Sequence, residues 1–148
     1  MPEGNAKFSA AELNLVLHAT EDEGKVLKSI QDVLMVPAER FSSQPSEGHY
    51  KNRISLLKAT LSSQEAGDLA LRVMSLLNSI DKDQLSRNLH EYSDERGNLY
   101  LRLDKQRVCQ GKVSLSEIDS IRIRFKPVKR FKPSSSIENY RGLLSSTE

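Results

Sequence analysis

The chain has 148 residues, of which 37% are hydrophobic and 28% are charged, so a single domain of ordinary size can bury a core without disulfides or metal ions. No apolar run approaches the roughly 20 residues of a membrane-spanning helix and no signal segment opens the chain, so we expect a soluble cytoplasmic protein without a membrane partner. Cys109 is the single cysteine, which excludes an intrachain disulfide and a thiolate zinc cage, and we expect it to be a small buried apolar residue.

The net charge of +2 hides an uneven distribution along the chain. Residues 1–50 hold 4 basic and 8 acidic groups, whereas residues 101–132 hold 10 basic groups and only 3 acidic groups. This kind of asymmetry is associated with proteins that bind polyanions.

The first regular element is expected at "ELNLVLHA" (residues 12–19), where apolar and polar residues alternate as in a half-buried strand. The motif "TEDE" (residues 20–23) then predicts a capping box between Thr20 and Glu23, which would start a helix that Pro37 limits. The apolar stripe of that helix is Val26, Leu27, Ile30, Val33 and Leu34.

A second unit of the same shape follows a Pro/Ser-rich loop and the segment "EGHYKNRI" (residues 47–54). A strand is expected at "ISLLKATL" (residues 54–61), and "SSQE" (residues 62–65) predicts a second capping box. A weak pattern indicates a short third helix over residues 81–90. The apolar stripe of the second helix is Leu69, Ala70, Val73, Leu76, Leu77 and Ile80.

Two further strands are expected in the basic part of the chain. The turn "DERGN" precedes "LYLRLD" (residues 99–104), and "SIRIRFK" (residues 120–126) alternates again. The segment 105–115 between them is compatible with a helical turn or a short strand.

These elements predict an α+β fold, a two-layer sandwich in which a mostly antiparallel sheet of about four strands carries two to three helices on one face. Residues 1–10 would be a flexible N-terminus, residues 11–131 a single RNA-binding-like domain, and the Ser-rich residues 132–148 a loose tail.

The helix-free face of this sheet is the most informative feature of the sequence. If the leucines and isoleucines face the helices, the pleat turns the intervening side chains to the other side. Cations there could bind successive phosphates, and rings could stack on unpaired bases. The alternative is a polar solvent-exposed face whose arginines discourage aggregation, although Asp104 is the single counter-charge in this pattern. The residues concerned are Asn14, His18, Tyr100, Arg102, Arg122, Arg124 and Lys126.

Catalysis and cofactor binding are not expected. His18, His49 and His90 are spread over a strand, a loop and a helix end, without HExxH or Cys/His spacing for a metal. Phosphate-loop and dinucleotide motifs are absent, as is the aromatic signature of RNA-recognition motifs, and the acidic start of the first helix would repel an anion. We therefore expect no catalytic residue, no metal and no cofactor, and any nucleic-acid binding must depend on shape and charge.

Three separated segments carry a resemblance to a known family: "HATEDEGKVLKSI", "EGHYKNRI" and "GNLYLRLDKQRVCQGKVSL", followed by a basic closing strand. They resemble archaeal RNA-binding proteins described as exosome subunits, whose fold is similar to that of the ribosomal protein that binds 5S rRNA. The likeness runs from about Leu13 to Phe125, in the same order. The matching positions are His18, Thr20, Glu21, Asp22, Gly48, His49, Tyr50, Asn52, Ile54, Asn98, Leu99, Tyr100, Asp104, Lys105 and Gln106.

The resemblance implies an RNA-binding protein of archaeal type, with exosome or ribosomal proteins as further partners. This chain departs from the family at Lys51 and Arg53, where glycine and proline are common, and both replacements add positive charge. The segment "EGHYKNRI" would form an RNA-contacting rim of the sheet; the alternative is a structural turn fixed by Gly48 and Asn52.

The sequence thus favours a non-catalytic RNA-binding protein that grips single-stranded or structured non-coding RNA. Two alternatives stay open: a protein-interaction adaptor that docks on an RNA-processing complex, and a small hydrolase or nuclease. The oligomeric state is not indicated. The predicted RNA-binding residues are His18, His49, Tyr50, Lys51, Arg53, Tyr100, Arg102, Lys105, Arg107, Arg122, Arg124 and Lys126.

Overall fold

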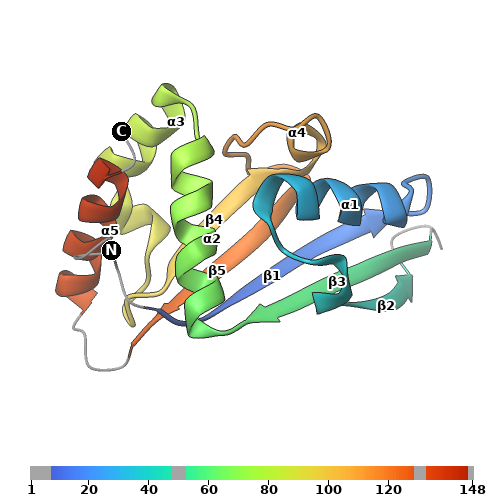
Figure 1. The fold of residues 1–148 in the computed structure, drawn as a ribbon, viewed down its shortest axis with the longest axis horizontal. Helices are drawn as coiled ribbons and strands as arrows, with labels where there is room; N and C mark the ends of the chain where they lie inside the picture. The colour runs from blue at the N-terminus through green and yellow to red at the C-terminus, as the bar shows by residue number, and fades with distance from the viewer. Residues whose placement is uncertain (1–7, 48–52, 129–132, 147–148) are drawn as a thin grey trace.

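The computed structural model describes residues 8–47, 53–128 and 133–146, and these form one five-stranded antiparallel sheet with helices against one face (Figure 1). The strand order is β2-β3-β1-β5-β4. The predicted α+β class is confirmed, but the described sheet has five strands rather than about four. The strands are β1 (Phe8–His18), β2 (Phe41–Glu47), β3 (Arg53–Leu61), β4 (Leu99–Asp104) and β5 (Ser120–Pro127).

The helices of the described residues form the second layer (Figure 1). Helices α1 and α2 lie across one face of the sheet, α4 lies beside α1, and α5 packs beside α2 and α3. They are α1 (Glu23–Leu34), α2 (Ser63–Leu76), α3 (Ser79–Arg87), α4 (Lys105–Cys109) and α5 (Pro133–Ser146), with short 3-10 turns η1 (Ala38–Arg40) and η3 (Leu89–Tyr92).

The alternating strand patterns place the core between sheet and helices, as predicted. In β1, Leu13, Leu15 and Leu17 are buried, while Asn14 and His18 between and after them are exposed. Strands β4 and β5 show the same alternation. The core therefore occupies the helix side of the sheet, and the opposite side is open to solvent.

The start of α1 differs from the prediction. Its N-cap is Asp22, whose side chain accepts a hydrogen bond from the amide of Lys25 at 3.2 Å, so the predicted capping box of Thr20 and Glu23 is wrong. The carboxylate of Glu21 instead accepts hydrogen bonds from the amide of His18 and from Lys105, and the helix starts two residues later than predicted. The predicted apolar stripe of α1 is confirmed, since its members are buried or packed against the core.

The second capping box is confirmed, with Ser62 and Glu65 bonded reciprocally at the start of α2. Its predicted stripe is correct up to Val73, and Leu77 is buried as well. Leu76 is 39% exposed and Ile80 is 77% exposed, because the helix ends at Leu76 and the chain turns into α3. The weakly indicated third helix corresponds to α3.

Strand β2 was not expected, because the sequence "FSSQPSE" reads as a Pro/Ser-rich loop. It pairs with β3 along its length and forms one edge of the sheet. An edge strand tolerates Pro45, since the missing amide need not join a ladder. Polar composition alone is therefore a poor guide to an edge strand.

The C-terminal segment also differs from the expected loose tail, because Pro133–Ser146 is helical. Tyr140, Leu143 and Leu144 of α5 are buried, and the Tyr140 ring stacks on Phe8 with centroids 5.9 Å apart. Phe8 itself belongs to β1, so order begins before the predicted boundary at residue 11.

Composition led to two further expectations, one on the burial of Cys109 and one on membrane-spanning helices. Cys109 is exposed at the end of α4, so the predicted burial of this residue is wrong; Val108 beside it enters the core instead. No helix within the described ranges is long and apolar enough to cross a bilayer.

Candidate nucleic-acid interface

The helix-free face of the sheet carries an excess of basic side chains. The register of the strands places five cations and two carboxylates on it, together with Asn14, His18 and Tyr100. All seven residues predicted for this face occupy it by strand parity. The cations are Lys58, Arg102, Arg122, Arg124 and Lys126, and the carboxylates are Glu12 and Asp104.

Arg102 and Arg122 stand directly opposite each other on β4 and β5. Both are exposed, and neither forms an ion pair with any other residue of the described ranges. Like charges in directly opposed positions destabilise a sheet unless an anion lies between them. This arginine pair is therefore suited to hold a phosphate.

Glu12 corrects the prediction that Asp104 is the single counter-charge. It lies on β1 in register with Arg124, whose Nη2 donates a hydrogen bond to Glu12 Oε1. Lys126 and Lys58 approach the same carboxylate at 3.8 and 3.9 Å. Arg124 and Lys126 are thus partly neutralised, and the unpaired charge is concentrated at the pair on β4 and β5.

Tyr100 lies on the outermost strand of this face and is 39% exposed. Its hydroxyl donates to Asp94 Oδ2 at 2.8 Å, which holds the ring in place. Burial raises the pKa of Asp94, but hydrogen bonds from Asn98 and Tyr100 outweigh it and lower that pKa below its usual value. Tyr100 therefore presents a fixed aromatic ring to solvent, as stacking on an unpaired base requires.

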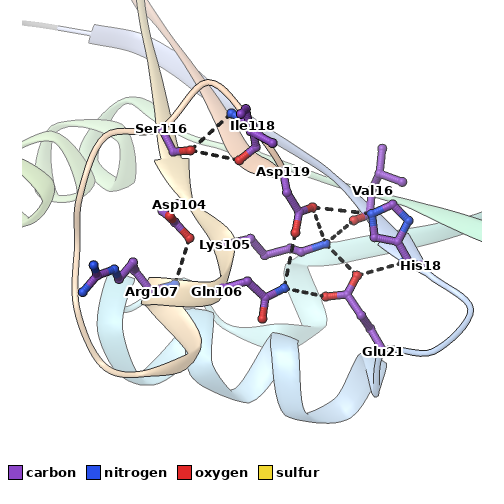
Figure 2. Close-up of polar contacts among 10 residues, drawn as sticks. All are labelled: Val16, His18, Glu21, Asp104, Lys105, Gln106, Arg107, Ser116, Ile118 and Asp119. Atoms are coloured by element: carbon purple, nitrogen blue, oxygen red, sulfur yellow. Dashed lines mark hydrogen bonds and ion pairs between the residues drawn. The ribbon is translucent and has the colours of Figure 1, made fainter.

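Lys105 is not an RNA contact, contrary to the prediction, because its side chain is fully buried. Its Nζ donates to the Val16 carbonyl at 2.7 Å and to Glu21 Oε1 at 2.7 Å, and it pairs with Asp119 Oδ1 at 2.9 Å (Figure 2). Three partners satisfy the three protons of an ammonium group. We call this group, with Gln106, the ion cluster.

Gln106 and His18 complete the surroundings of Lys105 (Figure 2). The amide of Gln106 donates to Glu21 Oε2 at 3.2 Å and to Asp119 Oδ2 at 3.3 Å, while His18 Nε2 lies 3.6 Å from Asp119 Oδ1. The first and third segments that carry the family resemblance, "HATED" and "DKQ", therefore meet in space. Glu21 and Lys105, two of the positions that match the family, therefore stabilise the fold.

The carboxyl groups of the ion cluster are stabilised in the charged form. Burial raises the pKa of both Glu21 and Asp119, but hydrogen bonds from Lys105 and its charge outweigh that effect, and both pKa values lie below their usual values. The amide of His18 adds to the effect at Glu21. A buried ammonium between two carboxylates thus joins β1, α4 and the start of β5.

Other predicted contacts are not brought together with the arginine pair. Arg107 is exposed on α4, on the helix side of the sheet, where it lines a hollow with Leu76 and Lys112. Arg53 begins β3 at a position that shares parity with the buried Leu57. His18 keeps 53% of its side chain exposed, beside Asp119. His49, Tyr50 and Lys51 lie outside the described residues.

Sequence reasoning missed Glu12, Lys58 and Asp119. The alternation of "ELNLVLHA" places Glu12 with Asn14, and that of "ISLLKATL" places Lys58 opposite the buried leucines, so both could have been found. Asp119 lies outside the alternating patterns, because it precedes β5 and has a backbone φ of 48°. Among the described residues, no group of three or more His, Cys, Asp or Glu side chains is placed to hold a metal ion.

Comparison with known proteins shows the family to which this chain belongs. A family model described as RNA binding matches residues 10–127. The chain is 33% identical over 121 residues to an RNA-binding protein of Pyrococcus abyssi, covering 78% of both chains. It is 26% identical over 144 residues to an uncharacterised protein of Methanocaldococcus jannaschii, covering 93% of this chain and 96% of that one.

Solved structures support the same assignment. A DUF54 protein of Archaeoglobus fulgidus superposes with a TM-score of 0.76 at 28% identity, over 93% of this chain and 99% of that one. A DUF54 protein of Methanothermobacter thermautotrophicus gives a TM-score of 0.76 at 26% identity, over 93% and 98%. The basic helix-free sheet, the family match over most of the chain and these archaeal relatives lead to one conclusion: the chain belongs to the RNA-binding family of archaeal DUF54-like proteins.

Proposed function

We propose that this protein binds single-stranded RNA, without catalysing a reaction on it, through the helix-free face of its sheet. The observation that carries the proposal is the opposed, unpaired pair Arg102 and Arg122. The backbones of the two strands that carry these arginines lie about 4.8 Å apart, and guanidinium groups bind phosphate oxygens through paired hydrogen bonds. A phosphate between them relieves their mutual repulsion.

The neighbouring side chains extend this contact into a strip. Tyr100 precedes Arg102 by two residues on the same face of β4, so a base can stack on its ring while the adjacent phosphate meets the arginines. Lys126 and Lys58 add long-range attraction, reduced by Glu12. About four phosphates can be engaged in this way, which predicts a slope near −3 for the logarithm of affinity against that of salt concentration.

A role as adaptor on an RNA-processing complex is the second candidate. Its support is the resemblance to proteins described as exosome subunits and the exposed edge strand β2, which could pair with another chain. With this role we also propose association with exosome or ribosomal proteins, a fold like that of the ribosomal protein that binds 5S rRNA, and a cytoplasmic location. A partner protein that stays bound after nuclease treatment at high salt would favour the adaptor.

The test is RNA affinity measured by fluorescence anisotropy with a labelled single-stranded oligonucleotide. The double variant Arg102→Gln/Arg122→Gln should lose at least about tenfold in affinity, and its salt slope should be smaller by about 1.4, because two phosphate contacts are removed. Both side chains are exposed and their like charges oppose each other, so the unfolding midpoint should not fall.

A matched control is available on the helix side. The variant Arg107→Gln/Lys112→Gln removes the same charge from exposed positions and should bind RNA like the wild type. Equal losses in the two double variants would show a general charge effect and would contradict binding by the sheet face.

A further inference from the structure

A hollow of about 610 Å³ lies at the outer edge of β4, beside the arginine pair. Its walls come from β4, from the loop 115–118, from α3 and from the end of η3. We propose that this hollow, here called the β4 cleft, binds one unpaired guanine base of the RNA. The inference rests on the proposed RNA binding and adds the base that the chain reads.

The size and walls of the β4 cleft fit a planar heterocycle. Its volume falls in the range of about 300–1,000 Å³ that small-ligand sites have. Tyr100 and Tyr92 contribute aromatic surface, and Ile118 is 82% exposed on the facing loop. A base inserted here covers apolar surface that otherwise meets water, and it stacks on a ring that every base can use.

The cleft is held open by hydrogen bonds that do not depend on a ligand. The amide of Ser116 donates to the Arg102 carbonyl and the amide of Leu115 donates to Asp81 Oδ2, both at 2.9 Å. The Tyr92 hydroxyl accepts from Gln84 Nε2 at 2.8 Å. The turn at Ser116 is closed by its own side chain, which bonds to Ile118 (Figure 2). Such preorganisation lowers the entropy lost on binding.

The polar groups of the cleft select the base. Glu91 and Glu117 line it and are exposed, and their carboxylates form no hydrogen bond or ion pair with another residue of the described ranges. An ionised carboxylate only accepts hydrogen bonds. Guanine offers two adjacent donors, N1–H and the N2 amino group, that match a carboxylate, whereas the single N3–H of uracil is flanked by two carbonyls that a carboxylate repels.

Arg102 connects the cleft to the sheet face. It lines the cleft and also stands opposite Arg122, so the phosphate next to the bound base can lie between the two arginines. The carboxylates exclude a phosphate from the cleft itself. The RNA backbone therefore runs over β5 and β4, and one base turns over the sheet edge.

The experiment compares two labelled probes, a short oligouridylate and the same oligomer with one central guanosine. The wild type should bind the guanosine probe about tenfold more tightly. The variant Glu91→Gln/Glu117→Gln should bring the ratio of the two affinities close to one. The loss of two negative charges raises affinity for both probes alike, so the ratio reports base selection alone.

The matched control is Asp32→Asn/Glu39→Gln, which removes the same charge from exposed positions near the other end of the sheet and should keep the ratio of the wild type. Tight binding of both probes with equal affinity would overturn the guanine site while leaving RNA binding intact. So would a guanosine preference that persists in the cleft variant. Failure of the wild type to bind either probe would instead overturn the proposed function.

Discussion

Arg102 and Lys105 lie three residues apart and carry the same charge, but they meet opposite environments. Lys105 is fully buried, with three oxygen partners in the ion cluster, whereas Arg102 is exposed opposite another arginine. One cation stabilises the fold and the other is left for a ligand. Strand parity and the positions of carboxylates decide which role a cation has, and the charge count of a segment does not reveal it.

The largest effect should come from Lys105→Met. It removes the cation between Glu21 and Asp119 and leaves two partly buried carboxylates facing each other, so the free energy of unfolding should fall by about 3 kcal/mol. Urea unfolding measures this. The comparison variant Arg102→Met should change stability by less than about 0.5 kcal/mol. Equal losses of stability in the two variants would contradict the structural role of Lys105.

Acid should weaken the ion cluster. The pKa values of Glu21 and Asp119 lie below their ordinary values of 4.5 and 3.8, so the folded protein binds fewer protons than the unfolded chain in that range. Their stabilisation is complete above those ordinary values and is lost as pH falls through the lower folded values. Urea midpoints measured from pH 6 down to pH 3 should fall for the wild type, and less steeply for Lys105→Met.

The smallest effect should come from Glu12→Gln, and it has the opposite sign for binding. Removing the carboxylate that pairs with Arg124 and Lys126 should raise RNA affinity by about 1.4- to fivefold, because charge pairs at a protein surface contribute roughly 0.2–1 kcal/mol. Anisotropy titrations at low salt detect this difference. Unchanged or weaker binding would mean that RNA avoids the centre of the sheet face.

The strands and their faces could be predicted from the sequence because alternation is a local signal. Leu99, Leu101 and Leu103 are all buried as expected, and Tyr100 and Arg102 between them are exposed. The β2 strand could not be predicted, since its pairing with β3 is decided by the neighbouring strand rather than by its own polar residues. The C-terminal helix was missed for a related reason, as Tyr140 is buried by distant residues.

The candidate site was predictable only in part. Parity correctly grouped Arg102, Arg122 and Tyr100, but the burial of Lys105 depends on Glu21 and Asp119, which approach from elements distant in the chain. The family likeness pointed to the same lysine without revealing that its role is structural. Long-range ion pairs of this kind produce no periodic pattern in a sequence.

RNA binding on the helix-free face along β4 and β5 is tested most directly by NMR. ¹⁵N-labelled protein is titrated with single-stranded RNA, and the backbone amide and arginine Nε–Hε resonances are followed. We expect the largest shifts in Leu99–Asp104 and Ser120–Pro127 and at the Arg102 and Arg122 side chains, with the resonances of α1 and α4 unchanged. Shifts concentrated on α1 and α4, with β4 and β5 unchanged, would contradict it.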